Sequence, residues 1–342
     1  MSDFASLVFY IIFFLLSFIF YYIYNKKNYK IFLFLSFIIP LLIGSLRYYV
    51  GTDYPTYIDL YNSKSNVDIG FSIITSIASK FNGFQTMFFL YNFLTLYFIF
   101  MGLKNLDRKV RPFAYFCFLF LNYTTSFNIV RQYLALSIVF YAYKYIIKKE
   151  PIKWILFTLI AFCCHNTAIL CAPFYIVLNS KNKRIKVLTL IITIIIALNY
   201  NTILKHLSSI SMFEHYEGYA NEYENSINNK MFFVDLMVLS YILLFRKKLL
   251  KNDNRNDIYI WLYIISVIIS LTGFFNPFVK RMGIYFGISK IILLSEIPLV
   301  CSKQNNKIIN YSIIIFYAIG IFIIGTYILK QANVIPYNMI GG

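Results

Sequence analysis

Apolar runs of nearly membrane-spanning length recur along the whole chain, separated by short clusters of lysine and arginine. Typical runs are "IFLFLSFIIPLLIGSL" at 31–46 and "NYSIIIFYAIGIFIIGTYIL" at 310–329. About 20 apolar residues in a helix cross the hydrocarbon core of a bilayer, and 59% of the 342 residues are hydrophobic. Lipid offers backbone groups no outside partner, and the alternating pattern of a β-barrel is absent. The sequence therefore predicts an all-α, polytopic integral membrane protein.

Twelve windows are candidates for transmembrane helices. The segment 67–83 carries polar residues across its apolar stripe, so we expect an interfacial or re-entrant helix there. No linker or soluble appendage interrupts the chain, which predicts a single domain over 1–342. The windows are 6–24, 31–46, 86–103, 112–127, 129–147, 152–164, 166–179, 187–203, 231–245, 258–276, 282–300 and 308–329.

Lysine and arginine gather in alternate loops, and this indicates the orientation of the chain. With the N-terminus outside, the six inner loops contain three, four, four, four, five and two of these residues, or 22 of the 32 in the chain. Because short cytoplasmic loops favour cations, we expect both termini on the extracytoplasmic side of the cytoplasmic (inner) membrane. Two outer loops follow: 47–85, with its interfacial helix, and 200–230, which is acidic and rich in tyrosine.

The net charge of +18 does not indicate nucleic-acid binding, because no soluble domain is present to carry a basic face. The five cysteines lie in or beside apolar runs, where we expect small core residues and not metal ligands. Asp53 and Asp59 are six residues apart with no histidine nearby. We therefore expect no metal site and no cofactor.

Three arginines lie at predicted helix ends on the outer side, where topology does not require them: Arg47, Arg131 and Arg281. One interpretation is snorkelling, in which a long side chain reaches the lipid headgroups. The other is phosphate binding, because the planar guanidinium matches phosphate oxygens and stays charged. A phosphate or pyrophosphate on a lipid carrier would lie at this depth in the membrane.

Two side chains near these arginines are candidates for a general base. Asp53 follows Gly51, whose missing side chain allows a tight turn, and its carboxylate would take a proton from a sugar hydroxyl. Its alternative role is an ion pair with Arg47 or Arg131. His165 lies in a predicted turn, and its imidazole titrates near neutral pH; its alternative role is that of a hydrogen-bonded structural residue.

Two ionisable residues, Asp235 and Lys290, fall inside predicted transmembrane helices. Charges in this environment are costly and usually paired. We therefore expect the two side chains to reach each other or to share a water-filled pocket.

Five short motifs resemble those of the EpsG family of exopolysaccharide proteins. They are "RYYVGTDYPTYIDLY", "NIVRQYLALSIVF", "FCCHNTAILCAPFYI", "KRMGIYF" and "NVIPYN", and they follow the family order over most of the chain. The histidine is followed by Asn166 and Thr167, a mild departure from the family pattern. The positions that match the pattern are Arg47, Asp53, Arg131, His165 and Arg281.

The resemblance implies a membrane protein of surface-polysaccharide assembly, similar to the Wzy-type polymerases that make O-antigen or exopolysaccharide. A helical bundle of the GT-C glycosyltransferase type is one architecture that we expect for such a protein. Its substrate would be an oligosaccharide carried on polyprenyl pyrophosphate in the membrane lipid, and chain-length regulators or flippases are potential protein partners. On this basis we expect catalytic roles for Asp53, His165, Arg131 and Arg281, and substrate-binding roles for Arg47, Tyr57, Gln132 and Tyr285.

Two other functions stay open: a transporter or flippase for lipid-linked oligosaccharide, and a polysaccharide O-acyltransferase. A flippase predicts charges near the midplane on several helices, whereas mainly Asp235 and Lys290 lie there. An acyltransferase would expose a histidine or an acid to a cytosolic acyl donor. In the predicted topology, however, His165, His206 and His215 all lie outside.

Overall fold

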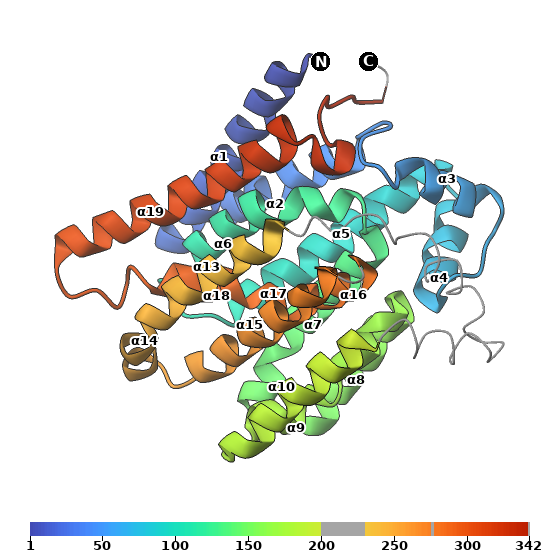
Figure 1. Cartoon of the computed structure of the whole chain (residues 1–342). Helices are drawn as coiled ribbons and strands as arrows, with labels where there is room; N and C mark the ends of the chain where they lie inside the picture. Colours follow the sequence, from blue (N-terminus) through green and yellow to red (C-terminus); the bar gives the residue numbers. More distant parts are fainter. Residues whose placement is uncertain (200–229, 275–276, 341–342) are drawn as a thin grey trace.

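The computed structural model describes residues 1–199, 230–274 and 277–340 (Figure 1). Within these residues the chain is all helical and contains no β-strand, and one isolated antiparallel bridge joins Arg47 to Met339. The predicted outer loop 200–230 lies outside the described residues apart from its last position. The helices are α1 (Asp3–Lys27), α2 (Lys30–Ser45), α3 (Tyr54–Asn62), α4 (Ile69–Ala78), α5 (Gly83–Lys104), α6 (Arg111–Phe118), η1 (Leu119–Tyr123), η2 (Thr124–Phe127), α7 (Val130–Ile147), α8 (Pro151–Cys164), η3 (Asn166–Cys171), α9 (Phe174–Asn179), α10 (Lys183–Leu198), α13 (Lys230–Leu244), α14 (Arg246–Asn252), α15 (Asn256–Leu271), η5 (Thr272–Phe274), α16 (Pro277–Met282), α17 (Ile284–Gly287), α18 (Ser289–Glu296), α19 (Gln304–Ile323), η6 (Ile324–Ile328) and η7 (Gln331–Asn333).

Apolar helices of sufficient length make the chain a multi-pass membrane protein. Four described helices are long and apolar enough to cross a bilayer: Asp3–Lys27, Gly83–Lys104, Asn256–Phe274 and Gln304–Ile328. Other predicted windows hold shorter apolar helices, such as Lys30–Ser45 and Pro151–Cys164. The all-helical class is thus confirmed, while the count of twelve spans stays a prediction.

Two predicted windows are interrupted. The window 112–127 contains α6, a π-helical turn (η1) and a 3-10 turn (η2) before α7 begins. The window 282–300 is divided between α17 and α18. Such breaks leave backbone carbonyls without a partner in their own helix, so other protein groups must bond them at membrane depth. After η2, the carbonyl of Phe127 becomes available in this way.

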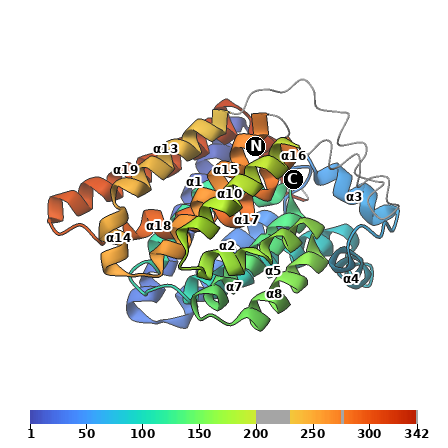
Figure 2. The same cartoon turned by 60° about the horizontal axis from the view of Figure 1, so that its bottom comes forward.

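Helix α7 occupies the centre of the molecule. Fourteen of its 18 residues are buried, as expected of a helix that is apolar on nearly all sides. It packs against α5 and α8, and the three helices lie side by side in Figure 2. The close approach of α5 requires Gly102, since a Cβ at this position would lie 2.3 Å from the Phe140 ring. The two ends of α7 therefore lie at opposite ends of a tightly packed bundle.

Both chain termini lie at one end of the molecule, together with residues 46–53 (Figure 1). We call this the loop end. The Tyr337 N–H donates to the Ser6 hydroxyl at 2.9 Å, and the Tyr10 hydroxyl donates to the Val334 carbonyl at 3.0 Å. These bonds join the start of α1 to the C-terminal segment. Whether the loop end is extracytoplasmic stays a prediction of the charge distribution.

The expected pairing of Asp235 and Lys290 is confirmed. Lys290 Nζ lies 3.5 Å from Asp235 Oδ1, and the Tyr263 hydroxyl donates to the same carboxylate oxygen at 3.3 Å. The two charged side chains are 15% and 19% exposed, so both are shielded. The pair joins α13 to α18, helices that are distant in sequence.

We expect Asp235→Asn to destabilise the protein, because Lys290 would keep its charge without a carboxylate partner. The cost is about 1–3 kcal/mol for a shielded but not fully buried group. Thermal unfolding of the purified protein in detergent measures it. Asp59→Asn serves as the control, because Asp59 is exposed. Equal unfolding midpoints for the two variants would contradict a stabilising role for the pair.

Candidate functional site

The side chain of Arg47 is buried in the protein interior at the loop end. The residue is 2% exposed, and its guanidinium donates to three carbonyls: Nε to Gly44 at 3.1 Å, and Nη1 to Val50 at 2.7 Å and to Phe127 at 2.6 Å. Burial lowers the pKa of Arg47 to about 10, so the side chain remains charged at neutral pH. One side chain thus joins the end of α2, the following turn and the break after η2.

Aromatic rings replace a carboxylate as the charge partner of Arg47. Its guanidinium carbon lies 4.7 Å from the centre of the Phe127 ring, 4.8 Å from Phe88 and 5.5 Å from Tyr54. The negative faces of such rings stabilise a desolvated cation. Within the described chain Arg47 forms no ion pair.

The turn after Arg47 requires a glycine. Gly51 has φ +104°, and a Cβ there would lie 2.9 Å from Asn128 Oδ1 and 3.0 Å from Arg47 Nη1. The predicted turn is therefore present, and the group that approaches the glycine backbone most closely is the protein itself.

The C-terminal segment holds the other side of this turn. The backbone N–H groups of Gly51 and Thr52 donate to the carbonyls of Asn333 at 2.9 Å and Ala332 at 3.2 Å. Asn128 Nδ2 also donates to the Ala332 carbonyl, at 3.2 Å. Residues 47–53 are consequently fixed between the α7 start and residues 331–340.

Asp53 lies at the end of this turn, directly before α3, and is partly exposed. Its carboxylate accepts a hydrogen bond from the Thr52 hydroxyl at 3.1 Å, and its N–H donates to Asn128 Oδ1 at 3.4 Å. The alternative role of an ion pair with Arg47 or Arg131 is not realised between these residues. The carboxylate is held near the site without being neutralised by either arginine.

Arg131 pairs with Asp68, an acid for which the sequence predicts no specific role. Nη1 of Arg131 contacts Asp68 Oδ2, and the two side chains are 18% and 3% exposed. The buried Nε of Arg131 has no hydrogen-bond partner among the described residues. The Tyr57 hydroxyl accepts from the Arg131 backbone N–H at 3.4 Å. Asp68 lies at the start of the predicted interfacial segment 67–83, directly before α4, and its place in a predicted outer loop was its only signal in the sequence.

His165 is held by a chain of hydrogen bonds in the predicted turn after α8. The Thr167 N–H donates to His165 Nδ1 at 3.3 Å, and the Thr167 hydroxyl lies 2.9 Å from the same nitrogen. The Tyr285 hydroxyl lies 2.9 Å from the Thr167 oxygen. Because a backbone N–H only donates, Nδ1 is the acceptor and the imidazole proton is on Nε2. His165 therefore presents a hydrogen-bond donor.

The charges of two arginines act on this imidazole. Burial, followed by the charges of Arg131 and Arg281, lowers the pKa of His165 to about 3. Arg281 lies on α16 with an exposed side chain, and its backbone carbonyl accepts from Gln132 Nε2 at 3.1 Å. The structure thus brings Arg131, His165 and Arg281 into one neighbourhood, with a neutral histidine between cations.

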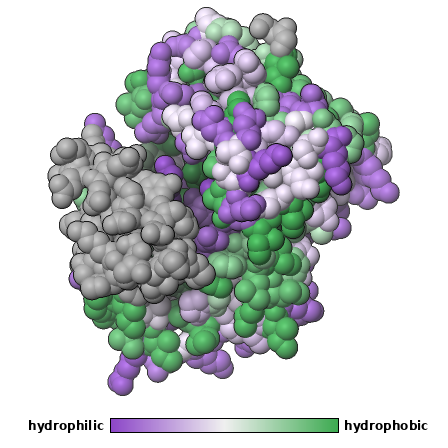
Figure 3. Space-filling model, turned by 90° about the vertical axis from the view of Figure 1, so that its right-hand side faces the viewer, coloured by the Kyte–Doolittle hydropathy of each residue, from purple (hydrophilic) through white to green (hydrophobic). Residues whose placement is uncertain are grey.

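The remaining predicted residues surround this cluster from inside the protein. Tyr57 and Gln132 are 6% and 4% exposed, and Tyr285 is fully buried. Figure 3 shows the side that carries α3 and α4: hydrophilic residues gather in the upper part of the described surface, above an apolar area.

Comparisons with known proteins give one match. A family model described as EpsG family matches residues 30–339, a range that includes every residue of the cluster. No curated protein and no solved structure matches the chain.

Acidification should destabilise the protein through His165. The pKa is about 3 in the folded protein against 6.5 for the free group, so the contribution is complete above pH 6.5 and falls as the pH drops toward 3. At pH 5 the loss is about 2 kcal/mol. Thermal unfolding at pH 7.5 and pH 5.0 should show a larger decrease for the wild type than for His165→Asn. Equal decreases would mean that His165 is readily protonated in the folded state.

Proposed function

Because the chain belongs to the EpsG family, and is therefore a membrane protein of polysaccharide biosynthesis, we propose that it polymerises lipid-linked oligosaccharide repeat units. The donor is a growing chain on polyprenyl pyrophosphate, and the acceptor is a terminal sugar hydroxyl of an incoming unit. The reaction takes place on the outer face of the cytoplasmic membrane. The observation that carries the proposal is that Arg131 and Arg281 both act on a neutral His165 whose Nε2–H is a hydrogen-bond donor.

Arg131 and Arg281 bind the departing pyrophosphate. Asp68 orients Arg131 through Nη1, and the part of the guanidinium that stays exposed donates to the phosphate oxygens. Preorganised cations stabilise the charge that develops on the leaving group in the transition state. The Nε2–H of His165 donates a hydrogen bond to the pyrophosphate oxygen that leaves the sugar, and the proton stays on the imidazole.

Asp53 acts as the general base. The acceptor hydroxyl oxygen bonds to the anomeric carbon, and Asp53 takes the hydroxyl proton. The bond from that carbon to the pyrophosphate oxygen breaks, and its electron pair leaves on the pyrophosphate. The partial exposure of Asp53 and its lack of an arginine partner support this assignment. His165 is the weaker candidate, since Nδ1 already accepts hydrogen bonds and its pKa is about 3.

The predicted substrate-binding residues receive positioning roles instead. Arg47, Tyr57, Gln132 and Tyr285 are each at most 6% exposed, which leaves little surface for a sugar. Arg47 holds the turn that carries Asp53. Tyr57 and Gln132 bond the backbones of Arg131 and Arg281, and Tyr285 acts on His165 through Thr167.

Products that accumulate in a deletion strain distinguish the proposed reaction from the alternatives. Single repeat units on the outer-leaflet carrier indicate a polymerase. Units trapped on the inner leaflet indicate a flippase, and polymer of normal length without acyl groups indicates an acyltransferase. Either of the last two results would overturn the proposal.

Arg131→Lys should reduce polymerisation about 100-fold, because a lysine keeps the charge but loses the planar pair of donors. Polymer length in the complemented deletion strain measures the loss, with the amount of protein in the membrane measured in parallel. Arg184→Lys is the matched control, since Arg184 is exposed and outside the cluster. Full polymer length in Arg131→Lys would exclude the phosphate-binding role.

Asp53→Asn should reduce polymerisation about 100-fold or more without lowering the unfolding temperature, because the amide keeps the shape and loses the basicity. Asp68→Asn should lower both, since it removes the ion pair of Arg131. Lipid-linked product and thermal unfolding of the two variants test this contrast. Normal polymerisation by Asp53→Asn would show that Asp53 only supports the loop.

A further inference from the structure

A second site lies at the other end of α7, remote from the cluster around Arg131. A cavity of about 230 Å³ is present where the C-terminal ends of α5 and α7 meet the first turn of α15. Arg131 and Lys148 are 17 positions apart on α7, which corresponds to about 25 Å along a helix. We call this end the basic end. The cavity takes no part in the proposed polymerisation.

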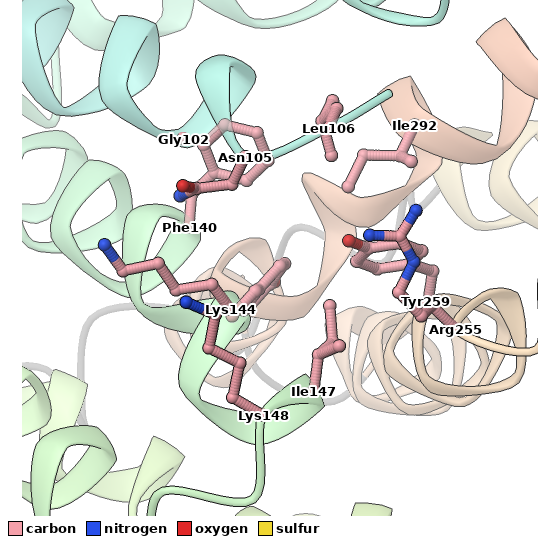
Figure 4. A pocket seen from close by; sticks show the side chains of 11 residues that line it. Gly102, Asn105, Leu106, Phe140, Lys144, Ile147, Lys148, Arg255, Tyr259 and Ile292 are labelled. Atoms are coloured by element: carbon pink, nitrogen blue, oxygen red, sulfur yellow. The ribbon is translucent and has the colours of Figure 1, made fainter. Parts of the chain in front are cut away.

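Cations line this cavity and acids do not. The lining includes Lys144, Lys148 and Arg255, and none of its eleven residues is acidic. Figure 4 shows the two lysine side chains lying beside each other along one wall, with Arg255 next to Tyr259 on the facing wall. An anion in the cavity would be attracted by cations on both walls.

The acids nearby neutralise only part of this charge. Asp253 pairs with Arg255 at 2.6 Å. Glu150, on the turn after α7, pairs with Lys153 at 2.8 Å. Lys144 Nζ lies 3.6 Å from the centre of the Tyr141 ring, a contact that holds the charge at the cavity without cancelling it.

Helix geometry explains the lysines but not the arginine. Lys144 lies in the last turn of α7, where a cation stabilises the negative end of the helix dipole. Arg255 occupies the N-cap of α15, where the dipole favours an anion. Asp253 accepts from the Arg255 backbone N–H at 2.8 Å and from its Nε at 2.6 Å, so an anion is already bound at this helix start, and a second anion would use the remaining guanidinium donors.

The other walls are apolar. Leu106, Phe140, Ile147 and Ile292 contribute hydrocarbon, and Asn105 and Tyr259 add polar groups. A free inorganic anion would contact only the cations. An amphiphile would contact both kinds of side chain, since its phosphate would bind the cations and its carbon chain would pack against the apolar side chains.

From this combination we propose that the cavity binds the phosphate group of an anionic amphiphile at the basic end. The inference stands independently of the polymerase function. The ligand is recognised by the phosphate together with the first methylenes of its apolar part. An acidic phospholipid is the probe of this chemistry, and inorganic phosphate distinguishes a soluble source.

The test is thermal unfolding of the full-length protein in detergent with added phosphatidylglycerol, phosphatidylcholine or inorganic phosphate. We expect phosphatidylglycerol to raise the midpoint of the wild type by several degrees and phosphatidylcholine to leave it unchanged. The double variant Lys144→Gln, Lys148→Gln and the single variant Arg255→Gln should lose at least half of this shift. If inorganic phosphate raised the midpoint as much as phosphatidylglycerol does, the cavity would be a site for soluble phosphate, and the proposal of an amphiphilic ligand would be wrong.

Two controls separate the cavity from general surface charge. The double variant Lys247→Gln, Lys303→Gln removes exposed lysines that do not line the cavity, and it should keep the full shift. Ile147→Trp fills the cavity without changing any charge, and it should abolish the shift. Equal shifts in all variants, or no shift in the wild type, would overturn the proposal.

Discussion

The loop end is organised by one buried cation, Arg47, whose partners among the described residues are carbonyls and aromatic rings and not a carboxylate. Arg47 binds carbonyls from the end of α2, from the following turn and from Phe127, where the η2 break leaves a carbonyl outside the α-helical pattern. A buried carbonyl that loses its hydrogen bond raises the free energy of the folded protein, so none of these carbonyls can move far from Arg47 without a loss of stability. The turn that carries Asp53 and the start of α7 that carries Arg131 are therefore fixed relative to each other.

The cluster has more positive than negative charge. Asp68 is almost fully buried and pairs with Arg131, while the side chain of Arg281 is exposed. His165 stays neutral because protonation would add a third positive charge to a poorly solvated place. Two guanidiniums with one carboxylate favour an anionic ligand over a neutral sugar, in agreement with the proposed function.

Sequence reasoning located the apolar helices, the turn at Gly51, the pair Asp235–Lys290 and the family, because each depends on local pattern or on a strong cost of isolated charge. It did not identify Asp68 as the partner of Arg131, since 63 positions separate them and several acids were equally available. Nor did it find that Nδ1 of His165 accepts hydrogen bonds, which depends on the orientation of Thr167. The number of membrane crossings also depends on breaks such as η1 and η2, which apolar composition does not reveal.

The bonds between residues 46–52 and 332–340 have a consequence for biosynthesis. The first of these segments is translated well before the second, because most of the helical bundle lies between them in the sequence. Until the second segment is made, the Gly51 and Thr52 amides lack their native partners, and the turn can be held only from the α7 side. The turn that carries Asp53 therefore reaches its described geometry later than the helices that flank it.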